Sequence, residues 1–109
     1  MATGTIKNGL KFTTLLENAT PAQYNADDTL IASGVTNYKY LIVTYFYGLS
    51  GYEYVRLIDI DNSSRPFMLE TIADNAFSAL AISKTNGKAT LYTNGSAGGV
   101  YIAKIVGVN

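Results

Sequence analysis

The stretch KYLIVTYFY, residues 39–47, determines the fold class of this 109-residue chain. It is rich in aromatic and β-branched residues and has no helical period, which is typical of a β-strand. Side chains alternate between the two faces of a strand. The odd positions are Lys39, Leu41, Val43, Tyr45 and Tyr47, and the even positions are Tyr40, Ile42, Thr44 and Phe46. Both sets are mostly apolar, so the sequence predicts a strand that is covered on both sides.

A strand of this kind needs a partner for its second face, because a two-layer domain buries only one face of each sheet. The 13 residues 40–52 carry no charge, and neither do residues 89–103. Such surfaces favour aggregation when a monomer exposes them. We therefore expect a homo-oligomer. The alternative is a strand that is central in its sheet and capped by a long loop over residues 18–28.

The rest of the chain contains further strand patterns separated by turn residues. The predicted strands are residues 11–16, 29–32, 39–47, 52–60, 67–73, 77–83, 89–93 and 100–108. Asn86-Gly87 predicts a hairpin with a type I′ turn, in which both central residues have positive φ. About eight strands without a substantial helix indicate an all-β fold, an antiparallel β-sandwich of jelly-roll-like type.

The composition excludes several classes of function. The chain has eight Lys plus Arg, eight Asp plus Glu, and neither His, Cys nor Trp. Catalytic arrangements that need His or Cys, metal sites built from those residues, and disulfides are therefore excluded. The pI of about 6.1 argues against nucleic-acid binding, and no apolar run is long enough for a membrane helix. We expect no cofactor, no nucleic-acid partner and no membrane insertion.

Tyrosine supplies the candidate binding site. Six of the nine tyrosines lie between residues 38 and 54, and several of them flank a glycine-containing turn at residues 48–51. A tyrosine ring stacks on the face of a sugar while its hydroxyl forms hydrogen bonds. The candidate ligand-binding residues are Tyr45, Tyr47, Tyr52, Tyr54 and Arg56, the last of which shares a strand face with Tyr52 and Tyr54. The alternative is that these tyrosines pack in sheets and subunit interfaces.

Asp59 and Asp61 form the acidic pair that most resembles a metal or catalytic site. A calcium ion would require six to eight oxygen ligands. A glycosidase would require a second carboxylate, for which Glu53, Glu70 and Asp74 are the candidates. An aspartate at the end of a strand usually begins a turn, and we interpret the pair in this way. We expect no metal site and no enzymatic activity.

The run TLIASGVTNYKYLIVTYFYG, residues 29–48, resembles the small β-sandwich head domains of bacteriophage tail fibres. It contains a Leu-x-x-Ser strand, an Asn-Tyr turn and a Tyr-Leu-Ile-Val-x-Tyr strand in that order. LLEN at residues 15–18 and IVGVN at residues 105–109 fit the same layout. Such domains often carry Trp at the position of Leu16, which is a departure. The family has no fixed binding residues, so none is transferred to this chain.

The resemblance implies a non-enzymatic receptor-binding tip that forms a homotrimer on a virion or an extracellular surface. The partner would be a host cell-surface saccharide or protein. Residues 1–9 would be a flexible segment or a link to a preceding fibre region, and residues 10–109 a single domain. Three alternatives remain: a bacterial lectin-like carbohydrate-binding module, a purely structural virion component, and a glycan-active enzyme that uses the carboxylates named above.

Overall fold

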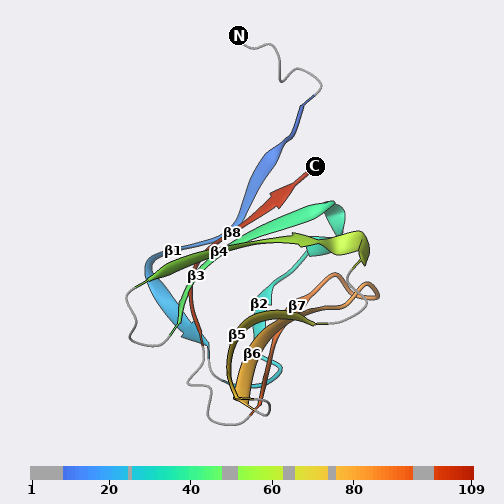
Figure 1. Cartoon of the computed structure of the whole chain (residues 1–109). Helices are drawn as coiled ribbons and strands as arrows, with labels where there is room; N and C mark the ends of the chain where they lie inside the picture. Colours follow the sequence, from blue (N-terminus) through green and yellow to red (C-terminus); the bar gives the residue numbers. More distant parts are fainter. Residues whose placement is uncertain (1–8, 25, 48–51, 63–65, 74–75, 95–99) are drawn as a thin grey trace.

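The chain folds into two antiparallel sheets that face each other (Figure 1). The structure is a computed structural model that describes residues 9–24, 26–47, 52–62, 66–73, 76–94 and 100–109. The strands are β1 (Phe12–Tyr24), β2 (Leu30–Ala32), β3 (Tyr40–Tyr47), β4 (Glu53–Asp59), β5 (Phe67–Ala73), β6 (Ala76–Ile82), β7 (Ala89–Asn94) and β8 (Val100–Val108). Two 3₁₀ turns, η1 (Val35–Asn37) and η2 (Ile60–Asn62), are the helical elements of these residues. The all-β, antiparallel prediction is confirmed.

The sheets have the strand orders β1-β8-β3-β4 and β2-β7-β6-β5. Strands β1 to β3 alternate between the sheets, and β7 and β8 do so again, as in a jelly roll. The middle of the chain pairs locally instead, because β3 and β4 form a hairpin in one sheet while β5, β6 and β7 form a meander in the other. Both β4 and β5 are therefore edge strands, and they lie on the same side of the sandwich (Figure 1).

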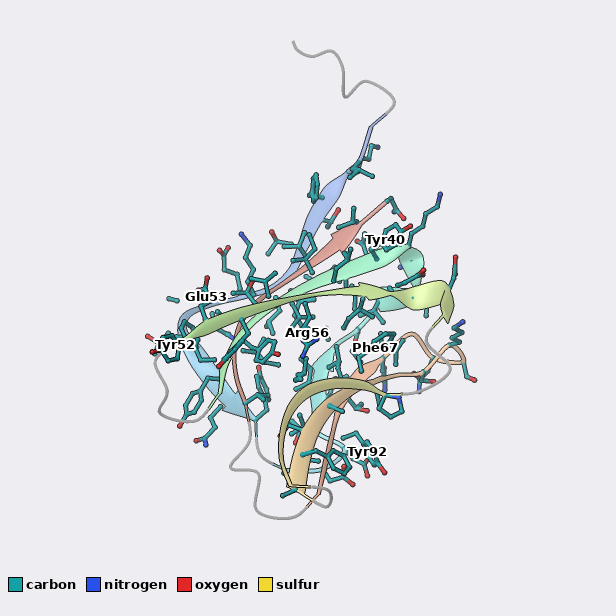
Figure 2. The ribbon with its side chains drawn as sticks, in the orientation of Figure 1. Tyr40, Tyr52, Glu53, Arg56, Phe67 and Tyr92 are labelled. Atoms are coloured by element: carbon teal, nitrogen blue, oxygen red, sulfur yellow. The ribbon has the colours of Figure 1, made fainter. Side chains whose placement is uncertain are left out.

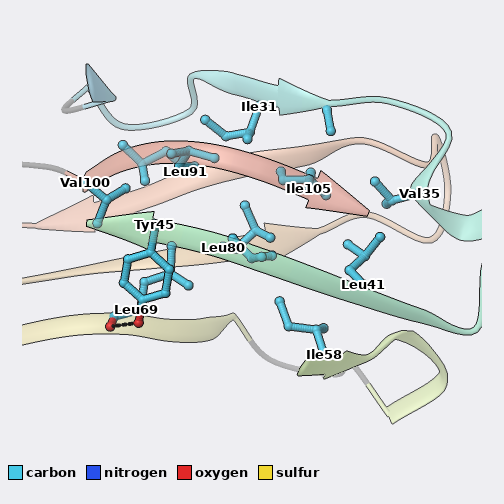
Figure 3. Packing of buried hydrophobic residues seen from close by; sticks show 14 of the residues in the cluster. Ile31, Val35, Leu41, Tyr45, Ile58, Leu69, Leu80, Leu91, Val100 and Ile105 are labelled. Carbon is cyan, nitrogen blue, oxygen red and sulfur yellow. Dashed lines mark hydrogen bonds between the residues drawn. The ribbon is translucent and has the colours of Figure 1, made fainter. Parts of the chain in front are cut away.

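Strand β3 occupies a central position between β8 and β4. Its odd-numbered residues Leu41, Val43 and Tyr45 are buried between the sheets, while its even-numbered residues are only half-buried on the opposite side. Figure 3 shows the core, in which Leu41 and Tyr45 of β3 pack in one cluster with Leu80 and Leu91 of the second sheet. The alternation predicted from residues 39–47 thus determines which face of β3 enters the core.

The predicted loop over residues 18–28 is wrong for most of its length, because β1 continues to Tyr24 along the edge of the first sheet. Its pairing with β8 is interrupted between Glu17 and Ala22, where the side chain of Asn18 donates a 2.8 Å hydrogen bond to the Ile102 carbonyl. An irregular edge strand tolerates Pro21, which lacks a backbone N–H. Since residues 18–24 lie beside β8, they do not form the cap that the monomeric alternative required.

The hairpin predicted around Asn86-Gly87 is present as β6 and β7, but its turn is longer than two residues. The Ser83 carbonyl accepts a hydrogen bond from the Gly87 N–H at 2.8 Å, and Ser83 N–H donates to the Lys88 carbonyl at 2.9 Å. Gly87 has a φ of 70°, whereas Asn86 is not among the described residues with positive φ. The type I′ prediction is therefore wrong, and a single left-handed glycine closes a wider loop.

Candidate functional site

Three of the five predicted binding residues lie at or along β4, the edge strand that faces β5 across the open side of the sandwich, and the other two lie on β3. Tyr54 and Arg56 pair with Tyr45 and Val43 of β3, so all four point towards the second sheet. Figure 2 shows Arg56 on this side of β4. Tyr52 immediately precedes the strand and is 71% exposed. The structure therefore places Tyr52, Tyr54 and Arg56 at one edge of the sheet, which their spacing did not indicate.

Tyr45 is not available to a ligand, which corrects its selection as a binding residue. Its side chain is 1% exposed, and its hydroxyl donates a 2.6 Å hydrogen bond to the Leu69 carbonyl (Figure 3). Leu69 lies at an irregularity in the pairing of β5 with β6, between Met68 and Glu70. Tyr45 therefore joins the two sheets at the position where β5 departs from its ladder.

Two exposed side chains extend outward from this buried tyrosine. The ring of Tyr54 stacks on that of Tyr45, with centroids 5.6 Å apart and an interplanar angle of 25°. The Arg56 Nε donates a 3.4 Å hydrogen bond to the Tyr45 hydroxyl, so the guanidinium group is anchored through one nitrogen while the residue remains exposed. An aromatic surface beside a guanidinium suits the faces and hydroxyls of a saccharide. The side chain of Tyr47 lies outside the described part of the chain.

Among the described acidic residues, Asp59 and Asp61 take part in one turn, and Glu53 lies far from Asp59. Asp59 Oδ1 accepts a 3.1 Å hydrogen bond from the Asp61 N–H, which is the turn-forming role that the sequence predicted. Glu53 and Asp59 lie at opposite ends of β4, about 20 Å apart at the usual strand rise. No group of three potential metal-ligating side chains occurs among the described residues. The Glu70 side chain and Asp74 lie outside them.

A second surface, which the sequence analysis recognised only on β3, covers the outer side of the first sheet. Paired residues share a face, and those on the side away from the second sheet form four rows across β1, β8, β3 and β4, in which Val108 is itself buried. The rows are Phe12, Val108, Tyr40 and Asp59; Thr14, Val106, Ile42 and Leu57; Glu17, Lys104, Thr44 and Val55; and Gln23, Tyr101, Phe46 and Glu53. We call this surface the outer face.

Large apolar side chains are most exposed at the two edges of the outer face. Phe12 on β1 is 61% exposed, and Val55 and Leu57 on β4 are 60% and 67% exposed. On the strands between them, Ile42 and Val106 are half-buried. The alternation of Val55 and Leu57 with Tyr54 and Arg56 was a visible signal for this surface. Local sequence does not reveal that β4 is an edge strand, so the alternation alone does not indicate that Val55 and Leu57 are exposed.

Among the described residues, no helix is long and apolar enough to cross a membrane. Comparison of the chain with protein-family models, curated proteins and solved structures finds no match.

Proposed function

We propose that this chain is a non-enzymatic attachment domain of a phage tail fibre or tail tip, which trimerises and binds a saccharide on the host surface. The observation that carries the proposal is the row of exposed side chains at Tyr52, Tyr54 and Arg56 along one sandwich edge. The resemblance of residues 29–48 to tail-fibre head domains supports the same conclusion, and a virion or extracellular location goes with it.

The edge is suited to recognition because its base is fixed. The Tyr45–Leu69 hydrogen bond and the stacked pair of rings hold Tyr54 and Arg56 on regular backbone. Side chains held in place before binding lose little conformational freedom when a ligand arrives. Each site would bind a saccharide weakly, and several copies on one particle would raise the avidity through effective concentration.

The test is binding of the wild-type chain to a glycan array, beside the variants Tyr52→Ala and Arg56→Ala. We expect each variant to bind at least about tenfold more weakly, a loss of roughly 1.4 kcal/mol. Tyr92→Ala is the matched control, because Tyr92 is an exposed tyrosine on the opposite sheet. Thermal unfolding of every variant checks that the fold persists. Unchanged binding in both edge variants, or an equal loss in the control, would remove the edge from the proposal.

The alternative is a bacterial lectin-like module, which would use the same edge outside a virion. A purely structural fibre component would bind no glycan at all. Assembly separates these proposals, since a fibre tip requires a trimer of about 35 kDa, three times 11.7 kDa. A lectin module that binds the array as a monomer or dimer would favour the alternative.

A further inference from the structure

The outer face is a surface of the size and composition that proteins use for assembly. Four strands at about 4.8 Å and eight residues at about 3.3 Å give a sheet face of roughly 19 by 26 Å, or about 500 Å². The largest apolar patches of monomers reach about 300–600 Å² and are often functional. Here apolar residues cover part of the face, since its rows also hold Glu17, Lys104, Glu53 and Asp59, and the most exposed apolar residues lie on the edge strands β1 and β4.

We propose that the outer faces of three copies of this chain close around a three-fold axis as a triangular prism, with one four-stranded sheet as each wall. A triangle with sides of about 19 Å has its centre about 5.5 Å from each side. Packed sheets lie about 10 Å apart, so each fills about 5 Å with side chains. Three four-stranded walls therefore close with their side chains filling the centre, whereas five-stranded walls would leave the centre about 7 Å away.

The corners of this prism explain why the edges carry the exposed apolar residues. At each corner, β1 of one copy lies beside β4 of the next, and the two strands run antiparallel because three antiparallel pairings separate them within one sheet. The rows of the outer face stay level around a three-fold axis. Thr14 of one copy is therefore level with Leu57 of its neighbour, and Phe12 lies one row away from Leu57. In a two-fold face-to-face dimer, the half-buried central strands would form the contact instead.

The charges of the outer face are compatible with this arrangement. Lys104 Nζ lies 3.6 Å from Glu17 Oε2 in the same row, so these two charges enter the interface as a pair. Glu53 and Asp59 lie at the ends of β4, in the first and last rows. At the corner, Glu53 is level with Gln23 of the neighbour and Asp59 with Phe12, so no acidic residue faces another.

This inference identifies the surface through which the proposed trimer assembles. It takes only the number of copies from the proposed function. The test uses the full chain with Thr14→Cys and Leu57→Cys combined, and its background contains no cysteine. Within one chain these positions lie on opposite edges of the sheet, about 14 Å apart, beyond the roughly 7 Å Cα separation that a disulfide spans. Oxidation should therefore produce covalent trimers on a non-reducing gel, with neither single variant forming a species larger than a dimer.

Light scattering coupled to size exclusion completes the test. We expect about 35 kDa for the wild type and 11.7 kDa for Leu57→Lys, with Tyr92→Lys on the opposite sheet remaining trimeric. A wild-type monomer, covalent dimers as the end point, or a trimer that Leu57→Lys leaves intact would each overturn the inference. None of these results depends on glycan binding. A trimer without glycan binding would leave the prism standing and remove the receptor-binding proposal.

Discussion

Replacing Tyr45 with phenylalanine tests whether this residue is structural, as its burial requires, or part of the binding site. The substitution keeps the ring that stacks on Tyr54 and removes only the hydroxyl, which donates the 2.6 Å hydrogen bond to the Leu69 carbonyl. Because the Tyr45 side chain is buried, water does not readily replace the lost donor. The same hydroxyl accepts the hydrogen bond from Arg56 Nε.

The expected loss follows from the desolvation of the unpaired carbonyl. A buried polar group that loses its partner costs about 1–3 kcal/mol. Unfolding entropy of about 2.1 cal/mol/K per residue gives about 0.23 kcal/mol/K for this chain, so Tm should fall by about 4–13 °C. Urea denaturation should give the same free energy with an unchanged m-value. All samples need one protein concentration, because association shifts apparent stability.

Tyr54→Phe is the matched control, since it removes the same atom from an exposed ring that makes no hydrogen bond among the described residues. It should change stability by less than about 0.5 kcal/mol. Tyr45→Phe should weaken glycan binding only modestly, because it keeps the ring that stacks on Tyr54 and removes only the hydrogen bond that the hydroxyl accepts from Arg56 Nε. A Tyr45→Phe variant as stable as wild type would refute the inter-sheet role. Loss of binding at unchanged Tm would return Tyr45 to the site.

Two further predictions concern Gly107 and the Glu17–Lys104 pair. A Cβ on Gly107 would lie 2.6 Å from Cγ of the Tyr38 ring, so Gly107→Ala should cost about 1–3 kcal/mol in urea denaturation. Combined with Tyr38→Ala it should cost less than the sum of the two single changes, and simple additivity would contradict the clash. Glu17→Gln leaves Lys104 without its partner inside the proposed prism, so the trimer should dissociate at a concentration at least about tenfold higher. The double variant Glu17→Gln with Lys104→Gln should recover assembly in analytical ultracentrifugation, and equal behaviour of the single and double variants would place the pair outside the interface.

The sequence predicted those parts of the fold that depend on alternation within one strand. Strand β8 and strand β5 have the predicted bounds, and the odd positions of β3 form its core face. The prediction failed where long-range pairing overrides local preference. Asn18 and Pro21 are loop-forming residues, yet β8 holds their segment at an edge where an irregular ladder tolerates them.

The site was predicted less completely because it depends on strand order. Parity alone places Tyr45 on one strand face with Leu41 and Val43, which indicates a core position although Tyr45 lies close to the glycine-containing turn. Parity also put Tyr54 and Arg56 on one face. Nothing local to β4 indicates that it is the edge strand of its sheet, and that position is what leaves both residues accessible.

The alternation along β4 allows assembly and recognition to be separated by mutation. Val55 and Leu57 point to the outer face, while Tyr54 and Arg56 point to the edge that faces β5. Neighbouring residues on one strand therefore serve different surfaces, since a side-chain period of two sends them to opposite sides. A substitution at Leu57 should lower the mass of the assembly without changing the intrinsic affinity of each site for the saccharide. A substitution at Arg56 should lower that affinity without changing the mass of the assembly. If both changes altered both properties, the edge and the outer face would be one continuous interface.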